Sequence, residues 1–433
     1  MKLKSLFFLT LSFSLAFAAE LKLTDALELA LKNHYGITIA KNQMQMADNQ
    51  RSAANSTLLP TLDAIGAYNY THRNAEQNPA LATVNGITTS NVFNAQLALN
   101  WTIFDGMRMF NNRSQIQSQA DFNTEGAQIL IEAAIVQVMN SYWQLASQQK
   151  TVEIAQQQLD ITSQRLAVQQ EKRSLGLLDS SEILKVKVDL NADSARLIEQ
   201  QLILNSLQNQ LNTSIGRNHG DPISAISALE LPEDLPPVSE WQNAAQEHNR
   251  NFNQLKLKLR SAELKQSIQS STLWPTLSVA GNYGYTNSHS NLPNSSSQDL
   301  NAWQGQVGVN ARWNIFNGFQ DKVAHQNNAI EVQNVQAEIK LQELLLNNLV
   351  QEQHQRMVQL LSKVNFENSA LDLAQQSFDF SAEKHKIGQL SSLEFRDAQG
   401  QLLAAQLRVM QAQLQAKQAL IELERLCGKI QLN

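Results

Sequence analysis

The chain has 433 residues, a formal net charge of −5 and a charged fraction of 17%, which lies below the usual quarter. This balance provides no basic footprint for nucleic acid, so we expect no nucleic-acid partner. Cys427 is the single cysteine, which excludes a disulfide framework and any metal site built from cysteines.

The amino-terminal segment has the layout of a secretory signal peptide. Lys2 and Lys4 precede an apolar run that ends in small residues around Ala18. The run is too short to span a bilayer as a helix, and no stretch of 18 apolar residues occurs later. We therefore predict that residues 1–18 are removed during export and that the mature chain has no transmembrane helix.

Two copies of one structural unit follow. Leu59-Pro-Thr-Leu62 matches Trp274-Pro-Thr-Leu277, and later motifs match at a constant offset of 212 positions. The later pairs include Trp101 with Trp313, Gly106 with Gly318, and Gly176 with Gly388. Chance similarity between two helical segments would match apolar positions, but it would not also match these helix-breaking residues. We predict repeat 1 over residues 19–216, a Pro-containing linker over 217–238, repeat 2 over 239–428 and a tail over 429–433.

Each unit is expected to contain a helix, a strand pair, a long helix, a turn and a returning helix. Thr24 and Ser239 are predicted N-caps of the first helices, which end before Pro60 and Pro275. The predicted strands cover about 61–71 and 93–105 in repeat 1, and about 276–286 and 303–317 in repeat 2. The polar segments 72–92 and 286–302 are predicted loops.

The predicted strands are two-faced. Phe93, Leu97 and Trp101 alternate with polar residues, which is typical of a strand that crosses an outer membrane with one side toward lipid. A soluble sheet gives the same alternation, but the adjoining helices are too long to pack around a small soluble sheet. Four strands cannot close a barrel alone, so the membrane interpretation requires several chains.

Long helices are predicted over 106–175 and 318–387, each about 100 Å long. An apolar position recurs every seven residues, as in Val138, Leu145, Val152, Leu159 and Leu166, which indicates coiled-coil packing. Gly176 and Gly388 end these helices, and the next helices, over 179–216 and 391–428, are predicted to open with capping boxes. The predicted boxes pair Asp179 with Glu182 and Ser391 with Glu394.

This order of elements resembles the TolC-like outer-membrane efflux protein family over essentially the whole mature chain. The resemblance implies a homotrimer in the outer membrane with a twelve-stranded β-barrel, four strands per chain, continued by a twelve-helix periplasmic α-barrel. It also implies a periplasmic adaptor (membrane fusion) protein and an inner-membrane transporter of the RND, ABC or MFS type. Small-molecule efflux is the implied function. Type I polypeptide secretion is an alternative, and a trimeric coiled-coil surface adhesin or scaffold is a rival from another class.

The resemblance also implies particular site residues. Glu394 and Asp397 match the acidic residues that ring the periplasmic mouth, although Glu182 and Glu394 could equally serve only as helix caps. Ser181 and Glu182 match one side of the family's gate link. On the other side, Leu390 stands where the family has Arg and His385 where it has Tyr. A gate link closed by a salt bridge is therefore not expected here. The implied adaptor contacts are the turns Leu175, Gly176, Leu177, Leu178 and Ile387, Gly388, Gln389, Leu390.

Trp101 to Gly106 and Trp313 to Gly318 are predicted strand-to-helix junctions at the periplasmic edge of the membrane, where the glycines let the chain bend. No metal, cofactor or catalytic motif is present in the sequence, since the histidines are scattered and no nucleophile elbow or phosphate-binding loop occurs. We therefore expect a non-enzyme without cofactors, whose energy for export comes from a partner.

Overall fold

The computed structural model describes residues 19–75, 86–175, 179–226, 229–291 and 296–430. The predicted signal peptide and the turn residues Gly176, Leu177 and Leu178 lie outside this range. Within it, no helix combines the length and the apolar character needed to cross a membrane. The described residues divide into two compact units: those up to 43, within 125–253 and from 341 onward form the first, and those within 44–124 and 254–340 form the second.

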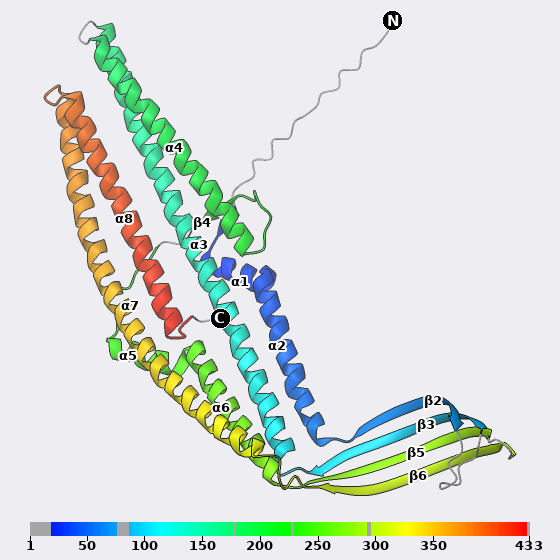
Figure 1. Ribbon diagram of the computed structural model, residues 1–433. Coiled ribbons are helices and arrows are strands. Elements are labelled where there is room, and N and C mark those ends of the chain that lie inside the picture. Colours follow the sequence, from blue (N-terminus) through cyan, green and yellow to red (C-terminus); the bar gives the residue numbers. More distant parts are fainter. Residues whose placement is uncertain (1–18, 76–85, 176–178, 227–228, 292–295, 431–433) are drawn as a thin grey trace, which may run out of the picture. The chain divides into compact units, whose positions relative to one another are not determined.

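The two halves of the chain present matching elements in the same order (Figure 1). The first half contains β1 (Ala19–Leu21), α1 (Leu23–Asn33), α2 (Tyr35–Ala53), β2 (Thr61–Ala75), β3 (Gly86–Phe104), α3 (Arg108–Ser174) and α4 (Ser180–Ser214). The second contains β4 (Ile223–Ala225), α5 (Val238–His248), α6 (Arg250–Ser270), β5 (Thr276–Asn291), β6 (Gln298–Arg312), α7 (Gln320–Lys386) and α8 (Ser392–Leu426).

The helix predicted at the start of each repeat is two helices. His34 and Asn249 take extended backbone conformations, and each uses its side chain to accept a hydrogen bond from the backbone three residues later. These residues therefore end one helix and cap the next. The predicted N-caps were also wrong, because Lys22 and Pro237, rather than Thr24 and Ser239, precede the first helical residues.

The second unit holds an antiparallel sheet in the order β2-β3-β5-β6. The strands extend into the segments predicted as polar loops, since β2 pairs with β3 as far as Ala75 and Gly86. Strand β6 ends at Arg312, so Trp313 to Phe316 is not the strand that the sequence predicted. The matching residues of repeat 1, Trp101 to Phe104, stay in strand β3 because they pair with β5. Strand β6 pairs with β5 on one side and has no neighbour on its other side among the described strands.

One face of this sheet is apolar from edge to edge. Paired residues project to the same side, and the register joins Tyr68 to Phe93, Leu97 to Tyr283, and Val279 to Val309. The opposite face carries mainly polar side chains such as Asn69, Gln96, Asn282 and Gln306. On the apolar face, Tyr68 is 67% exposed, Val307 81% and Val309 69%, so no described segment covers it.

The core of the first unit surrounds the short parallel pair β1 and β4. Tyr142 of α3 is fully buried there, and its hydroxyl donates to the carbonyl of Leu21 at 2.9 Å. Ile215 and Ile223 pack in the same cluster. The core thus joins the middle of α3 to the end of α4 and to the linker that begins the second half of the chain.

The strand-to-helix junctions of the second unit share a left-handed turn. Gly106 and Gly318 have φ values of +68° and +69°, and the residues after them, Met107 and Phe319, also have positive φ. The indole of Trp101 donates to the carbonyl of Leu58, and that of Trp313 donates to the carbonyl of Leu273. Each tryptophan therefore connects its junction to the short turn that precedes the first strand of the same pair, β2 or β5.

Candidate functional site at the helix turns

The turn between α7 and α8 is closed by glycine and by a complete cap. Gly388 has a φ of +77°, a left-handed conformation that favours glycine. The amide of Gln389 donates a hydrogen bond to the carbonyl of Lys384. Ser391 accepts a hydrogen bond from the amide of Glu394, while the Glu394 carboxylate accepts from the Ser391 amide at 2.9 Å. The structure contains the capping box predicted here.

The two acidic residues predicted for a gate are both exposed in the single chain. Hydrogen bonds from Ser391 lower the pKa of the Glu394 carboxyl, which keeps it ionised. Among the described residues, the hydrogen-bond donor to the Asp397 carboxylate is the side chain of Gln401, one turn later on α8. The Glu394 carboxylate therefore takes part in capping helix α8, whereas the Asp397 carboxylate does not.

The first turn differs from the prediction. Asp179 caps α4 by accepting from the amide of Ser180 and the hydroxyl of Ser181, which lowers the pKa of the Asp179 carboxyl. Glu182 does not complete a capping box, because its carboxylate pairs with Lys185 at 2.6 Å instead. The capping box predicted at this turn was therefore wrong. The hydroxyl of Ser181 donates to the capping residue Asp179 instead.

His385 and Leu390, the residues that depart from the family's gate link, contact each other. The Nδ1 atom of His385 lies 3.1 Å from the carbonyl oxygen of Leu390, and its ring stacks on Phe395 with centroids 4.8 Å apart. Burial lowers the pKa of His385, so the imidazole is neutral at neutral pH. These contacts hold the second turn together within its own hairpin.

The buried stripe on the far part of α3 is polar. Gln158, Thr162, Arg165 and Gln169 are all at most 6% exposed and follow helical spacing. The predicted apolar positions Leu159 and Leu166 lie beside this stripe and are only half-buried. We name the stripe, with its partners on α4 and α8, the polar seam.

The centre of the polar seam is Asp193 of α4, whose side chain is 1% exposed. The guanidinium of Arg396 on α8 donates to both of its oxygens at 2.8 Å, and the Thr162 hydroxyl donates at 2.7 Å. Burial alone would raise the pKa of Asp193, but these hydrogen bonds outweigh burial and hold it below the ordinary value of 3.8. The polar seam thus links α8 to α3 and α4.

Sequence reasoning missed this link because it searched for apolar periodicity and for the family's own residues. The usable signal was the helical spacing of polar residues from Gln158 to Gln169, together with a lone arginine, Arg396, at the start of α8. Gln399 completes the network by donating to Thr162 at 3.0 Å. Among the described residues, no group of three or more His, Cys, Asp or Glu side chains could hold a metal ion.

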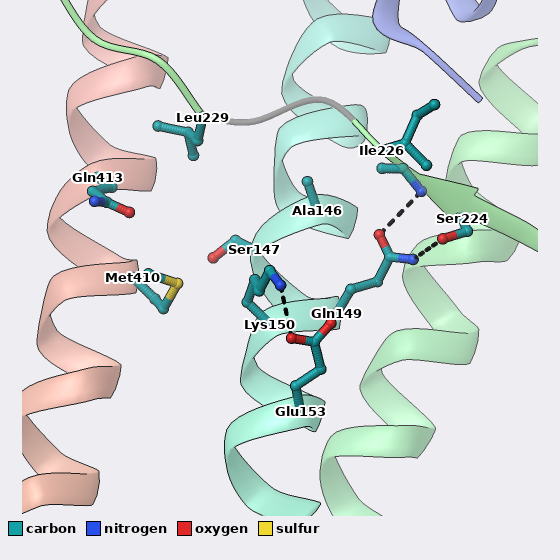
Figure 2. Close-up of a pocket in the computed structure, with 11 residues that line it drawn as sticks. Ala146, Ser147, Gln149, Lys150, Glu153, Ser224, Ile226, Leu229, Met410 and Gln413 are labelled. Atoms are coloured by element: carbon teal, nitrogen blue, oxygen red, sulfur yellow. Dashed lines mark hydrogen bonds and ion pairs between the residues drawn. The ribbon is translucent and has the colours of Figure 1, made fainter. Parts of the chain in front are cut away.

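The described residues of the first unit line a smaller and a larger cavity. A cavity of about 520 Å³ is bordered by α3, by Ser224, Ala225, Ile226 and Leu229, and by α8, and Figure 2 shows its side chains. Several of its polar groups pair with each other: Gln149 donates to Ser224 and accepts from the backbone of Ala225, and Lys150 pairs with Glu153 at 2.7 Å. A second cavity, of about 870 Å³, brings Glu182, His385 and Leu390 to one place near the turns.

A family model described as outer membrane efflux protein matches residues 26–217 and 241–429, one match to each repeat. No curated protein sequence matches the chain. The fold is similar to the outer membrane protein VceC of Vibrio cholerae, with a TM-score of 0.74, 15% identity and coverage of 94% of this chain and 96% of that chain.

Two further solved structures show the same fold. The CmeC outer membrane channel of Campylobacter jejuni has a TM-score of 0.76 at 14% identity, with coverage of 94% of this chain and 85% of that chain. The MtrE outer membrane channel of Neisseria gonorrhoeae, in its open state, has a TM-score of 0.66 at 16% identity, with 94% and 88% covered. At these identities the likeness concerns the fold alone.

Proposed function

The chain belongs to the outer membrane efflux protein family, and on this premise we propose that it is an exit duct for small molecules. Drugs and other toxic compounds would pass from an inner-membrane pump and a periplasmic adaptor through the duct to the exterior. Members of this family are trimeric channels of the outer membrane that extend into the periplasm, and this protein is located there.

The apolar face of the β2-β3-β5-β6 sheet is the observation that carries the proposal. A continuous exposed apolar surface is unfavourable in water but matches the hydrocarbon of a bilayer. The polar opposite face suits a water-filled lumen. Strands β2 and β6 have a neighbour on one side only among the described strands, which supports closure by three copies into a twelve-stranded barrel.

The helical hairpins then belong to a periplasmic tunnel with twelve helices. We assign the adaptor contacts to the turns around Gly176 and Gly388, where Leu175 and Ile387 are each 67% exposed. Exposed apolar side chains at a hairpin tip are suited to a protein partner. The transporter class, whether RND, ABC or MFS, belongs to the partner and is not specified by these contacts.

A ring of carboxylates from Glu394 and Asp397 of three chains would favour cations at the tunnel entrance. Replacing both residues by Ala should reduce the cation selectivity of the purified protein in planar bilayers, measured as the reversal potential in a salt gradient. Glu383→Ala, which removes an exposed acid one turn before the second glycine, is the control and should have a smaller effect. An unchanged reversal potential in the double variant would reject the acidic ring.

Loss of the gene should make the cells more sensitive to several unrelated small toxic compounds, because the exit route is missing. The measurement is the minimum inhibitory concentration with and without a plasmid copy of the gene. Unchanged sensitivity together with the loss of one polypeptide from the medium would instead support polypeptide secretion. A protein that makes no pore in planar bilayers would support the scaffold alternative.

A further inference from the structure

The larger cavity, which we name the turn cavity, holds buried polar groups that no described residue satisfies. It lies where α3, α4, the second turn and the start of α8 meet, and its volume is about 870 Å³. Arg165 and Gln169 line it from α3 and are 6% and 4% exposed. In the described part of the chain, four buried atoms here have no hydrogen-bond partner. The Arg165 Nε and Nη1 atoms are donors, whereas the Gln169 Oε1 atom and the Nε2 atom of neutral His385 are acceptors, so an anion can satisfy only the two arginine donors.

Such groups are costly to leave unpaired, and the cost is greatest for the guanidinium. A buried donor without an acceptor loses about 1–3 kcal/mol of solvation, and more when it is charged. Among the described residues, Arg165 is paired through its Nη2 atom, with the carboxylate of Asp189. A small adjustment of the side chain would allow an acceptor in the turn cavity to meet the remaining donors.

The charges around the turn cavity leave an excess of one cation. Lys185 pairs with Glu182, Arg165 pairs with Asp189, and Arg396 pairs with Asp193. Lys172 also lines the turn cavity and has no ion-pair partner among the described residues. One unpaired ammonium balances a monoanion, whereas a phosphate dianion would add uncompensated negative charge beside Glu182 and Asp189.

The lining also contains Ser391, Ser392 and three apolar side chains. Val188 of α4, Leu390 of the second turn and Leu393 of α8 border the turn cavity, and Val188 and Leu393 are 67% and 79% exposed. Sites for small organic ligands combine apolar contacts with polar groups that fix the orientation of the ligand, and the turn cavity offers both. The smaller cavity of about 520 Å³ differs, because its charged pair, Lys150 and Glu153, and its Gln149 side chain have partners within its own lining.

We propose that the turn cavity binds a small organic monocarboxylate. Its carboxylate would lie between Arg165 and Lys172, and its hydrocarbon part would lie against Leu390 and Leu393. The site is independent of the acidic residues assigned to the entrance, and its occupation does not require the protein to conduct.

Hexanoate is a suitable probe, with hexanamide as its neutral counterpart of similar shape. Isothermal titration of the full-length protein, held in amphipol, should show saturable binding of hexanoate and much weaker binding of hexanamide. Lys172→Gln should weaken hexanoate binding about threefold and Arg165→Gln about tenfold, since each removes a charge near the carboxylate. Arg408→Gln, which breaks a pair with Glu367 outside the turn cavity, should leave binding unchanged.

Circular dichroism and gel filtration establish that each variant is folded and correctly assembled. Should Arg165→Gln fail to fold, Lys172→Gln still decides the outcome, because Lys172 makes no hydrogen bond that the described structure records. Equal binding of hexanoate and hexanamide, equal binding by the wild type and Lys172→Gln, or no binding by the wild type would each overturn the proposal. Tighter binding of inorganic phosphate than of hexanoate would overturn the choice of a monocarboxylate.

Discussion

Replacing Asp193 by Ala is expected to lower the free energy of unfolding of the helical part of the protein by about 3 kcal/mol. The substitution leaves the Arg396 guanidinium and the Thr162 hydroxyl without their acceptor in a largely buried place. Urea unfolding of the purified protein, followed by far-ultraviolet circular dichroism, measures the change. Glu367→Ala, which removes a half-exposed pair with Arg408, should cost less than about 1 kcal/mol.

A second variant separates the buried charge from simple loss of packing. Replacing Asp193 and Arg396 together by Leu removes both charges, so it should recover much of the stability lost in Asp193→Ala. If Asp193→Ala and Glu367→Ala cost the same, the polar seam is no more stabilising than a surface pair. Because the pKa of Asp193 is lowered, its contribution is present above pH 3.8, its ordinary value, and is lost as the pH falls below that value.

Replacing Gly106 by Val is expected to reduce the yield of heat-resistant trimer severely. A Cβ atom at this position would lie 2.7 Å from the Cβ atom of Trp274 and 2.8 Å from the backbone oxygen of Ser271, and the φ of +68° disfavours a branched side chain. Seminative electrophoresis of outer-membrane fractions measures the trimer, with total protein in the membrane as reference.

Gly318→Val is the matched comparison. Gly318 has nearly the same φ, +69°, but an added Cβ atom would meet no described atom within 4 Å. Within one chain, Gly318→Val should therefore destabilise the fold mainly because valine is strained in a left-handed backbone conformation, by about 1–2 kcal/mol. Normal trimer yield in Gly106→Val would show that the junction glycines do not limit assembly. Equal damage in both variants would instead indicate that another copy of the chain packs against Gly318.

The helices and the repeat could be predicted because their signals are local. Helix α3 runs from Arg108 to Ser174 where the sequence predicted 106–175, since glycines flank a long segment without proline. The alternation in Phe93 to Trp101 likewise indicated the strand and its two faces. Such patterns depend on neighbouring residues only, and the duplication supplied each of them twice.

The strand lengths could not be predicted because pairing overrode local propensity. Residues such as Thr88 to Asn91 read as a polar loop, yet they pair with β2 on one side and, from Thr89, with β5 on the other. The reverse holds for Trp313 to Phe316, which look like a strand but pair with no described strand. Register is a property of two segments, and one segment alone does not reveal it.

The candidate site was only partly predictable. In the sequence, Gly388 and the predicted cap Ser391 indicated the position of the second turn. The resemblance to the family indicated Glu394 and Asp397. The contact of Arg396 with Asp193 joins residues more than 200 positions apart, and nothing in either segment alone indicates that contact. Burial of Arg165 is also contrary to its usual place at the surface. Both follow from how the hairpins pack together, which a heptad pattern leaves undetermined.

The open edges of the sheet have a consequence for biogenesis. The outer N–H and C=O groups of β2 and β6 bond to no described strand, so the sheet is completed only when other copies arrive. Its maturation is then a reaction of higher than first order in chain concentration, unlike the folding of the helical hairpins. Slow synthesis would lengthen the time each chain spends with an uncovered apolar face, when chaperones and proteases compete with its sister chains for that surface.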